Sequence, residues 1–584
     1  MDQSRVAELL KEIGVLLELK GENQFKTRAY SSASRTVENL NESLEELVRT
    51  DRLSEIRGVG TALQEKIREL VETGSLKYYE ELKSSIDPGL IEMLEIPGLG
   101  PKKVRSLHQK LEINTVAALE DVCRNGKVES LTGFGKKTQD RILKGIEFRK
   151  EHSRYHLIDN ALVIADRIRE LLRSHPDVIQ CSPAGSLRRH KEVIRDLDFL
   201  VSSRRASEVI QFFIAQPDVK EITAQGETKA SVVFDNGFQG DLRVVSDSEF
   251  AFALAYFTGS KEHNVVMRQR AKDRGERLNE YGLYPSSTDG TDAHLVSKVC
   301  HTEEELFLEL GLDYIEPELR ENMGEFEASE SGTLPKLIEW TQLRGSLHNH
   351  SKWSDGDQSF EQIAELAEEL GLAYWAITDH SRSSFQANGL NEDRLLRQIE
   401  EIKQFNIELE KQGREFRLLA GTEVDILNEG KLDFDADILS RLEVVVASVH
   451  SGFTQSESEM TRRLIRAVEN PNVNILGHMT GRLLLKREAY AVNQRKVIDA
   501  CSETGTFIEI NANPRRLDLD WRLWNYARNK GVRCVINCDA HRADHFAFLK
   551  VGAGIARKGW LTPEEVVNTR PVEEVRALLR SKRE

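Results

Sequence analysis

Six short apolar runs between residues 373 and 538 constrain this chain most strongly. Each has the length and the β-branched or aromatic content of a buried strand, and the segments between them are long enough for helices. The runs are "AYWAIT" (373–378), "FRLLAG" (416–421), "VVVASV" (444–449), "VNILG" (473–477), "FIEINA" (507–512) and "RCVINC" (533–538). This alternation is typical of β/α units, so we expect a parallel sheet here.

Side chains that can bind metal ions follow five of these six runs. They are Asp379 with His380, Glu423, His450, His478, and Asp539 with His541. Six of the seven histidines between residues 345 and 545 fall at or just past expected strand ends, whereas packing alone would place several in the helices. We interpret the seventh, His545, as structural. Because the carboxyl ends of barrel strands converge on one face, the pattern predicts a metal site there.

A series of motifs in this region resembles the PHP (polymerase and histidinol phosphatase) domain: "LHNHSKWSDG", "ITDH", "GTEVDIL", "ASVH", "LGHMTGRLL" and "INCDAH". The resemblance implies a phosphoester hydrolase with up to three metal ions, and mixed imidazole and carboxylate ligands suit Mn²⁺ or Zn²⁺. The implied ligands are His348, His350, Asp355, His380, Glu423, His450, His478, Asp539 and His541. Asp355 is preferred to Asp357 because it lies in the S-D-G turn.

Three arginines near these motifs are candidates for binding the substrate phosphate. Arg482 lies in "HMTGRLLLKRE", and Arg515 and Arg516 lie in "NANPRR". A guanidinium group can bind phosphate through paired hydrogen bonds, but it can equally form a structural ion pair. Both roles stay open for Arg482 and for Arg515 or Arg516.

A second set of carboxylates lies in the middle of the chain. The run "DLDFLV" places Asp196 and Asp198 two residues apart on an expected strand, so both point to the same face. Asp241 begins "DLRVV", which reads as part of a neighbouring strand. Three carboxylates that converge from two strands can hold two Mg²⁺ ions. The upstream G-S turn and Arg189 then become candidates for binding a triphosphate.

Two segments resemble the family X DNA polymerases, the group similar to DNA polymerase beta: "AGSLRRHKEVIRDLDFLVSS" (184–203) and "YFTGSKEHNVVMRQRA" (256–271). The resemblance implies template-directed DNA synthesis, with Mg²⁺ or Mn²⁺ held by the three aspartates. The implied dNTP-binding residues are Gly185, Ser186, Arg189, Tyr256, Phe257, Gly259, Asn264 and Arg268. Of these, Asn264 would contact the incoming base and Arg268 the template side of the new pair.

One place departs from the family pattern. Members usually carry a glycine before the first aspartate, preceded by a small residue, and both approach the triphosphate. This chain has Ile194 and Arg195 there. Arg195 either binds phosphate itself or blocks its approach. We expect a working polymerase and keep a weakened or inactive one as the alternative.

Glycine pairs recur three times in the first 150 residues, each before an expected helix. They are Gly58 and Gly60, Gly98 and Gly100, and Gly133 and Gly135. A tight turn with two glycines exposes backbone N–H groups at a helix N-terminus, which can hold a phosphate oxygen without reading base sequence. The three copies resemble helix–hairpin–helix motifs, which grip the DNA backbone, and K⁺ or Na⁺ is expected at the turns.

The first hairpin and its surroundings resemble the small lyase domain of DNA polymerase beta, in "NQFKTRAYSSASRTV" (23–37) and "GVGTALQEKIRELVETGSLKYYEEL" (58–82). The resemblance makes Lys66 the Schiff-base lysine and Lys26 a phosphate contact. A lysine is nucleophilic only when part of it is unprotonated, and Glu65 and Glu69 lie close in sequence. The alternative is a surface lysine on a DNA-binding face.

Composition limits the remaining possibilities. The net charge of −15 argues against a uniformly basic nucleic-acid binder, so DNA contacts must be concentrated in particular segments. Six scattered cysteines without C-x-x-C pairs indicate neither a disulfide scaffold nor a zinc finger. No stretch approaches the roughly 20 apolar residues of a membrane span, and a signal-peptide core is lacking. We expect a cytoplasmic monomer that binds gapped or primed DNA and dNTPs, and no membrane.

The expected fold class is multidomain α+β and α/β. It comprises helical helix–hairpin–helix domains, a polymerase-beta-like nucleotidyltransferase palm and a distorted (β/α)7 PHP barrel. The expected boundaries are 1–85 for a lyase-like domain, 86–150 for a fingers-like helical domain, 151–260 for the palm, 261–316 for a thumb-like domain, 317–340 for a linker and 341–584 for the PHP domain. This order resembles bacterial and archaeal family X DNA polymerases.

The expected function is gap filling in DNA repair by two-metal nucleotidyl transfer, with a Mn²⁺-dependent 3′→5′ exonuclease and abasic-site endonuclease in the PHP domain. The alternative is a PHP nuclease whose weakened polymerase core only binds DNA. A small-molecule phosphatase of the histidinol-phosphatase type and a non-catalytic DNA-binding scaffold are further rivals. The hairpins argue against the first, and carboxylates that are costly to bury without metal argue against the second.

Overall fold

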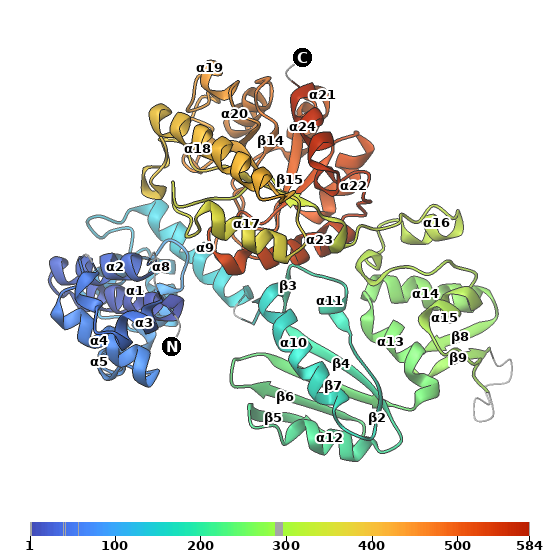
Figure 1. Ribbon diagram of the computed structural model, residues 1–584. Helices are drawn as coiled ribbons and strands as arrows, with labels where there is room; N and C mark the ends of the chain where they lie inside the picture. Colours follow the sequence, from blue (N-terminus) through green and yellow to red (C-terminus); the bar gives the residue numbers. More distant parts are fainter. Residues whose placement is uncertain are drawn as a thin grey trace. The chain divides into compact units, whose positions relative to one another are not determined.

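A computed structural model of the protein (Figure 1) describes residues 3–38, 40, 43–56, 58–152, 154–286 and 296–582. The chain divides into two compact units, residues 1–154 and residues 155–584. Their buried apolar residues form separate clusters, so each unit has its own core. None of the described helices is both long and apolar enough to cross a membrane.

The first unit is helical throughout its described part. Its α-helices are α1 Gln3–Lys20, α2 Gln24–Glu38, α3 Leu44–Arg49, α4 Thr61–Thr73, α5 Lys77–Ser84, α6 Pro88–Leu94, α7 Pro101–Leu111, α8 Val116–Arg124 and α9 Lys136–His152. Helix α1 packs against α2, α5 and α7. Apolar residues three or four positions apart, such as Val6, Leu10 and Ile13, form its buried face. The three glycine pairs lie at the starts of α4, α7 and α9.

A five-stranded sheet, the palm, begins the second unit and has the order β2-β4-β7-β6-β5. Its strands are β2 Val178–Pro183, β4 Asp196–Ser203, β5 Val219–Gln225, β6 Lys229–Phe234 and β7 Gln239–Val245. Strands β4 and β7 are parallel, while the other neighbours run antiparallel. Helices α10 (Ile158–Arg173) and α12 (Ala206–Ile214) pack on the sheet. Because successive strand residues alternate between faces, Leu197 and Phe199 are buried while Asp196 and Asp198 share the opposite face.

The thumb-like part follows the palm. Its elements are α13 Phe250–Thr258, α14 Lys261–Asp273, β8 Glu276–Asn279, β9 Gly282–Pro285, α15 Glu303–Glu309 and α16 Glu325–Glu330. Leu319 and Leu337, from the segment predicted to be a linker, belong to the same buried cluster as Phe307. Charged residues of this segment are also buried, in pairs such as Arg320 with Glu303 at 2.6 Å. Residues 319–337 therefore pack with the thumb-like helices, whereas Ile338 belongs to the buried cluster of the palm and barrel.

Seven parallel strands form a nearly closed barrel in the order β10-β11-β12-β13-β14-β15-β16. They are β10 Gly345–Ser346, β11 Tyr374–Ile377, β12 Arg417–Asp425, β13 Val444–Ser448, β14 Ile475–Leu476, β15 Phe507–Asn511 and β16 Cys534–Asn537. The ends of β10 and β16 meet where Asn349 and Ala540 form a parallel bridge. Each predicted run contains one strand, and β10 adds the seventh, which confirms the predicted barrel. Strand β12 extends farther than predicted, so Glu423 lies within it.

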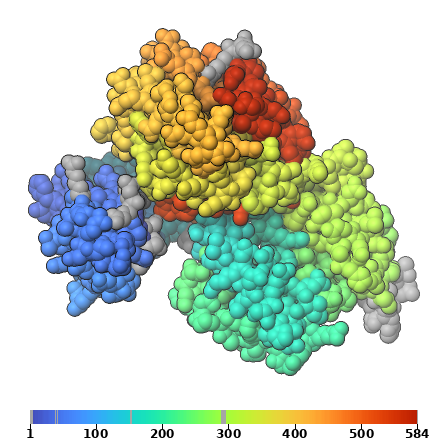
Figure 2. Space-filling view, in the orientation of Figure 1, coloured from blue at the N-terminus to red at the C-terminus, as the bar shows by residue number. Residues whose placement is uncertain are grey.

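Helices surround the barrel (Figure 1). They are α17 Phe360–Glu369, α18 Glu392–Lys411, α19 Ala436–Leu439, α20 Glu457–Val468, α21 Gln494–Thr504, α22 Trp521–Asn529, α23 Phe548–Lys558 and α24 Val572–Ser581. In Figure 2 the yellow surface on one side of the barrel comes from the segments of α17 and α18. The helices thus cover strands that are apolar on both faces, as parallel strands require.

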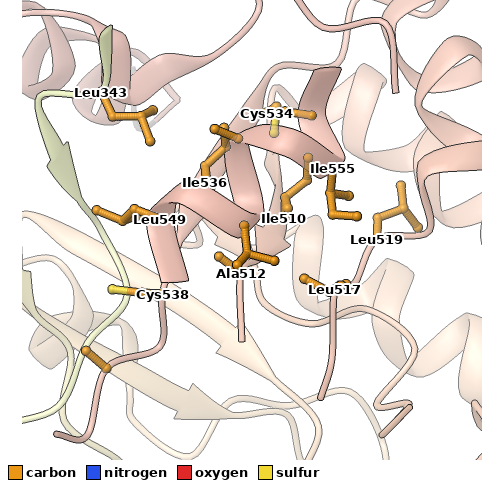
Figure 3. Packing of buried hydrophobic residues seen from close by; sticks show 14 of the residues in the cluster. Leu343, Ile510, Ala512, Leu517, Leu519, Cys534, Ile536, Cys538, Leu549 and Ile555 are labelled. Atoms are coloured by element: carbon orange, nitrogen blue, oxygen red, sulfur yellow. The ribbon is translucent and has the colours of Figure 1, made fainter. Parts of the chain in front are cut away.

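Helix α23 packs directly against the outside of β15 and β16. Its Ile555 lies in one buried cluster with Ile510 and Ile536 (Figure 3). A Cβ atom on Gly552 would lie 2.6 Å from the Cβ of Ala512 and 2.7 Å from the Cγ2 of Ile536. Since real side chains do not approach so closely, glycine at this position allows the helix to contact the sheet.

The same helix also contacts the loop of the palm that carries Arg189. Lys558 is buried, and its Nζ donates hydrogen bonds to the carbonyl oxygens of Arg189 (2.8 Å) and Glu318 (3.2 Å). It also donates to the carboxylate of Glu321 (2.7 Å). Burial lowers the pKa of Lys558 to about 8, and Glu321 opposes this shift. Because a buried ammonium group needs partners, these contacts fix the palm loop to the barrel.

Strand β15 allows a test of the barrel core. Replacing the buried Ile510 with alanine leaves a cavity, so we expect the free energy of unfolding of the barrel to fall by about 2–5 kcal/mol. The same substitution at Ile407, which is partly exposed on α18, should cost less than about 1 kcal/mol. Urea unfolding, followed by tryptophan fluorescence, compares the two variants. Equal unfolding midpoints would contradict the packing described for β15.

Candidate active sites

The carboxylate of Glu423 lies at the centre of the candidate metal site in the barrel. It is buried near the end of β12, and nitrogen atoms of five histidines lie within 3.6 Å of its oxygens. They belong to His348 (3.3 Å), His350 (3.6 Å), His380 (2.9 Å), His450 (3.2 Å) and His478 (3.0 Å). These histidines follow four strands, β10, β11, β13 and β14, and the carboxyl ends of parallel strands meet at one edge of a barrel.

The nine ligands implied by the resemblance lie together at this edge. Ligand atoms lie within 4.8 Å of one another in three groups: His350 with Asp355, His380 and His541; His348 with His350 and Asp539; His380 with Glu423 and His450. His478 joins them through its 3.0 Å contact with Glu423. The geometry can therefore hold divalent metal ions, while the role of each residue as a ligand stays a prediction.

One buried nitrogen atom shows how a metal ion would fit this cluster. The Nδ1 of His350 is buried without a hydrogen-bond partner in the described part of the chain, and the carboxylate of Asp355 lies 3.8 Å from it. An unpaired polar atom is costly inside a protein. A metal ion would satisfy it, and mixed imidazole and carboxylate donors suit divalent transition metals.

The convergence of charges shifts several pKa values in the metal-free cluster. Burial alone would raise the pKa of Glu423, but the surrounding histidines hold it well below its usual range. Burial alone would lower the pKa of His450, but Glu423 and Asp425 raise it to about 10. For His350 burial dominates and lowers the pKa to about 3. Protonated histidines must lose their protons to a metal ion, so metal affinity should rise with pH.

A second layer of buried carboxylates orients the histidines and is not predicted by the sequence patterns above. Glu509 accepts a hydrogen bond from the Nδ1 of His348 (2.7 Å), and Asp425 accepts one from the Nδ1 of His450 (2.8 Å). Such bonds fix the tautomer and the ring orientation of a metal-binding histidine. Glu509 lies inside "FIEINA", the one run that leads into no predicted ligand. A single charged residue within an apolar strand is the signal that would identify it.

Two other polar residues near the cluster have structural partners. Asp379 accepts hydrogen bonds from Ser351 (2.6 Å) and Gln398 (2.5 Å), so it fixes the loop after β10. Arg482 donates to the carboxylate of Asp520 (2.9 Å) and to the carbonyl oxygen of Arg516 (2.8 Å). Of the two roles left open for Arg482, these contacts favour the structural ion pair.

An open pocket of about 580 Å³ gives access to the cluster. Glu423, His450 and Asp539 line it, together with Arg516 and the segment 383–387. The Nε of Arg516 lies 3.5 Å from the carboxylate of Asp539. Arg516 thus places a guanidinium group beside the candidate metal site, where it could bind a phosphate group.

The three aspartates of the palm lie on one face of its sheet. Strands β4 and β7 pair in register with Asp198 opposite Asp241, and Asp196 lies two residues earlier on β4. Gly185 has a φ angle of +61°, and a Cβ atom on it would lie 1.9 Å from a carboxylate oxygen of Asp198. Only glycine fits this position, so the G-S turn lies directly against the aspartates.

The ligand atoms of these aspartates do not form a group as tight as those of the barrel. In the described part of the chain, all groups with ligand atoms within 4.8 Å of one another lie in the barrel. Asp241 accepts a hydrogen bond from Ser231, and Asp196 pairs with Arg195 at 3.1 Å. Burial, with the charges of Asp196 and Asp241, raises the pKa of Asp198 to about 7. Divalent ions would neutralise this repulsion, and carboxylate donors suit Mg²⁺ or Mn²⁺.

Of the two residues that depart from the family pattern, Ile194 is buried and Arg195 is exposed. Ile194 is fully buried on β3 (Val193–Ile194), which pairs with β1 (His156–Leu157). Its side chain therefore belongs to the core. Arg195 is exposed, and its guanidinium group forms the 3.1 Å ion pair with Asp196. A cation in this position competes with a metal ion for the carboxylate.

Arg189, predicted to bind a triphosphate, already has a carboxylate partner. Its Nε lies 3.1 Å from Glu321, and its Nη1 donates to the carbonyl oxygen of Thr258. Burial alone would raise the pKa of Glu321, but Lys558 and Arg189 lower it to about 2. Glu321 is therefore ionised and shared among three cations, Arg189, Lys191 and Lys558, and it holds Arg189 beside the palm site.

The other predicted dNTP-binding residues lie on α13, α14 and α11 (Gly185–Arg188), the last of which contains Ser186, while Gly259 lies between α13 and α14. The Nδ2 of Asn264 donates to the carbonyl oxygen of Tyr256 (2.7 Å), whose ring contacts Phe257 edge to face at 5.3 Å. A Cβ atom on Gly259 would lie 3.3 Å from Arg189. Arg268 is exposed one turn after Asn264. Most of the motif thus gathers where α13 meets α14.

The glycine pairs of the first unit form open turns. The first glycine of each pair has a positive φ angle: +82° at Gly58, +86° at Gly98 and +92° at Gly133. Gly60 and Gly100 begin α4 and α7 without a side-chain cap. Cβ atoms at five of the six positions would meet no atom within 4 Å; at Gly98 one would approach Arg141. Such turns leave room for a phosphate group at a helix N-terminus, also at Gly135.

Lys66 and Lys26 lie beside the same aromatic ring. The Nζ of Lys66 is 4.9 Å from the ring centroid of Tyr78, and the Nζ of Lys26 is 5.8 Å from it. Lys66 also donates to the carbonyl oxygen of Ala62 (3.1 Å), and Lys26 lies 3.8 Å from Glu22. The structure thus brings together the two lysines that the lyase resemblance selects.

The raised pKa of Asp198 predicts how the metal-free protein responds to pH. Between its ordinary value of 3.8 and about 7, this carboxyl holds a proton in the folded protein but not in the unfolded chain. Stability should therefore fall as pH rises through this window, by at most about 1.4 kcal/mol per pH unit. Asp198→Asn should remove this part of the slope in urea unfolding with a chelator present. A constant difference from the unaltered protein, as expected for Asp235→Asn at an exposed site, would contradict the assignment.

Four segments of the chain match known domain families. Residues 1–76 match a helix-hairpin-helix domain, and residues 90–147 match a SAM-like helix-hairpin-helix tandem. Residues 253–321 match the DNA polymerase beta thumb, and residues 346–513 match the PHP domain. The matches follow the order in which the resemblances appear along the sequence.

Known proteins are similar to the whole chain or to one half of it. "DNA polymerase/3′-5′ exonuclease PolX" of Bacillus subtilis (strain 168) is 39% identical over 583 residues, covering 99% of this chain and 100% of the relative. DNA polymerase lambda of Rattus norvegicus is 28% identical over 46% of this chain and 48% of its own length. A probable phosphatase of Thermoanaerobacter sp. (strain X514) is 27% identical over 41% of this chain and 95% of its own length. The chain therefore belongs to the family X DNA polymerases with a C-terminal PHP domain.

Proposed function

We propose that this protein fills gaps in DNA with its palm and removes nucleotides from DNA 3′ ends with its barrel. One observation carries the proposal: a single chain holds two separate sets of side chains of the kinds that bind metal ions, the aspartates of the palm and the cluster around Glu423. The full-length relative, named a DNA polymerase/3′-5′ exonuclease, supports both activities. A small-molecule phosphatase would need neither the palm nor the hairpins.

In synthesis, the palm residues bind and orient the reactants. Asp196, Asp198 and Asp241 would hold Mg²⁺ or Mn²⁺, and Asp198 must first lose the proton that it retains up to about pH 7. Bound divalent ions supply the positive charge that activates the attacking hydroxyl group and stabilises the leaving oxygen, here and in the barrel. Gly185 lets the backbone of the G-S turn lie directly against Asp198, so this turn would meet the triphosphate of a dNTP beside the aspartates. Arg189 would bind that triphosphate.

The remaining dNTP contacts would come from the thumb-like part. They are Tyr256, Phe257 and Gly259 at the sugar, Asn264 at the base and Arg268 at the template side. Ser186, on α11 of the palm, would contact the phosphates. The hydrogen bond from Asn264 to the carbonyl oxygen of Tyr256 couples the base contact to the sugar pocket. These roles require a dNTP as substrate and gapped or primed DNA as template.

In hydrolysis, the barrel residues would hold up to three Mn²⁺ or Zn²⁺ ions. Glu509 and Asp425 keep the donor nitrogens of His348 and His450 directed at the site. Arg516 would bind the phosphate that is cleaved, because it lines the pocket next to Asp539. The same site would incise DNA at abasic positions, since that reaction also breaks a phosphodiester bond.

The helical unit would hold the DNA backbone through its open glycine turns, with K⁺ or Na⁺ at the turns. Lys66, beside Lys26, would form a Schiff base with an abasic sugar. This division of labour suits a chain of net charge −15, because contacts to DNA are confined to short segments. We place the protein in the cytoplasm as a monomer.

A second function is favoured by the ion pair between Arg195 and Asp196. If this pair persists on DNA, the palm binds substrate but extends it slowly, and the barrel nuclease is the main activity. The protein would then use its polymerase core chiefly as a DNA-binding module.

Separate loss of the two activities tests the main proposal. The assay uses a gapped duplex with a labelled primer, Mn²⁺ and dNTPs. Asp198→Ala should lower primer extension by more than about 100-fold and leave primer shortening intact. Loss of a residue that only hydrogen-bonds to a metal ligand already lowers activity by about 10–100-fold, and loss of a ligand should cost more. His348→Ala should lower shortening to the same extent and leave extension intact. Asp235→Ala and His301→Ala, at exposed sites, are the matched controls. Shortening by His348→Ala at the unaltered rate would refute the nuclease assignment.

Replacing Arg195 distinguishes obstruction from phosphate binding. If Arg195 obstructs the site, Arg195→Ala should lower the KM for dNTP by about 2- to 5-fold, since an exposed ion pair is worth at most about 1 kcal/mol. Arg204→Ala, at a nearby exposed arginine, should leave the KM unchanged. Steady-state gap filling at fixed Mg²⁺ measures both variants. A higher KM for Arg195→Ala would instead identify Arg195 as a phosphate-binding residue.

A further inference from the structure

Phe385 lies at the mouth of the metal pocket and is 88% exposed, more than any other large hydrophobic residue that the structure describes. A single exposed apolar residue is common on protein surfaces and needs no explanation. Phe385 differs because it lines the pocket around Glu423, and so does Leu427, which is 36% exposed. The rim of a highly charged pocket therefore carries an aromatic ring and an aliphatic side chain.

Hydrogen bonds fix the segment that carries this ring. The hydroxyl group of Ser384 donates to Asp425 (2.7 Å), the carboxylate that orients His450, and the backbone N–H of Ser383 donates to Asp433 (2.7 Å). On the other side of the ring, the Nδ2 of Asn388 donates to the carbonyl oxygen of Trp353 (3.2 Å). The 3-10 helix Phe385–Ala387 is thus held to the metal site at both ends, while the ring itself remains exposed.

The two ends of the segment that carries Phe385 also pair with each other, which fixes the segment further. Strand-like pairing joins Ser381 to Leu390, and the N–H of Leu390 donates to the carbonyl oxygen of His380 (2.7 Å). A Cβ atom on Gly389 would lie 2.0 Å from the carbonyl oxygen of Ser381, so glycine is required there. Phe385 therefore projects from a short closed loop that begins directly after the candidate ligand His380.

The pocket has two chemically different regions. Its interior holds the histidines and carboxylates that would bind metal, with Arg516 beside Asp539. These groups suit a phosphate. Its rim, at Phe385 and Leu427, offers apolar surface and a flat ring. A ligand that matches both regions carries a phosphodiester next to a flat aromatic group, which describes a nucleotide within a DNA strand.

We propose that Phe385 is a stacking platform for the nucleobase adjacent to the phosphate cleaved in the barrel. The inference rests on the proposed nuclease function and adds to it a residue that selects nucleotides over other phosphoesters. Stacking is tolerant of base identity because every base has an aromatic face. The site would therefore accept unpaired 3′ ends of any sequence. A missing base next to the cleaved phosphate would weaken binding, so incision at abasic positions by this site would be slower than removal of a normal 3′ nucleotide.

Single-turnover shortening of single-stranded DNA with Mn²⁺ tests this role. The substrates carry a normal 3′ end, an abasic residue at the last position or an abasic residue at the second-last position. Phe385→Ala should slow shortening of the normal end by about 5- to 100-fold, the effect typical of losing one stacked base. It should cause no further loss on the substrate that lacks the stacked base, on which the unaltered protein is already slow.

Three comparisons separate the possible outcomes. Phe385→Tyr should retain the rate, and Tyr281→Ala, at another exposed aromatic residue, should not alter it. Binding of the normal and abasic strands to His348→Ala, with and without Phe385→Ala, should show the same preference without turnover. Equal effects of Phe385→Ala on all three substrates would overturn the stacking role. Failure of the unaltered protein to shorten DNA would instead refute the nuclease function itself.

Discussion

The convergence of five histidines on one buried carboxylate, Glu423, is the interaction on which the hydrolytic half of the protein depends. An isolated carboxylate inside a protein is strongly disfavoured, and two of the histidines compensate for it, because Glu423 and neighbouring carboxylates raise the pKa values of His348 and His450. That arrangement requires strands that all end at the same edge, which a parallel barrel supplies. Glu509 and Asp425 then limit the orientation of two of these rings. The fold therefore determines the site: the barrel brings the carboxylates and histidines together, and the buried carboxylates require positive charge beside them.

In the palm, the negative charge of the carboxylates is reduced in a different way. Its aspartates share one face, where burial and the neighbouring carboxylates raise the pKa of Asp198 to about 7 and Asp196 forms an ion pair with Arg195. The barrel site is thus assembled before metal binds, whereas the palm site must exchange a proton and an ion pair for metal. Lys558 links the two halves, since it reaches from the last turn of α23 to Glu321, the partner of Arg189. The polymerase loop is therefore held in place by the domain that performs the opposite reaction.

Much of this could be predicted from the sequence because it is local. Strand-length apolar runs and the residues that follow them predict the barrel and the cluster, and Asp196 and Asp198 share a face because side chains alternate along a strand. What the patterns miss depends on tertiary partners. Glu509 looks like an irregularity in a strand until His348 is placed beside it. Residues 317–340 look like an exposed linker in the sequence because charged residues are ordinarily exposed to solvent. In the structure Arg320 of this segment is instead buried in an ion pair with Glu303. No sequence pattern singles out Phe385, because its proposed role depends only on its position at the pocket around Glu423.

The central claim is that one chain carries two metal centres of opposite chemistry. The most direct measurement is anomalous X-ray scattering from crystals of the protein grown with Mn²⁺, recorded on both sides of the manganese absorption edge. The account predicts strong peaks among Glu423 and its histidines, and a separate peak beside Asp196, Asp198 and Asp241. Absence of any peak at Glu423 while the palm is occupied would contradict it, because the cluster of buried charges would then have a purpose other than binding metal.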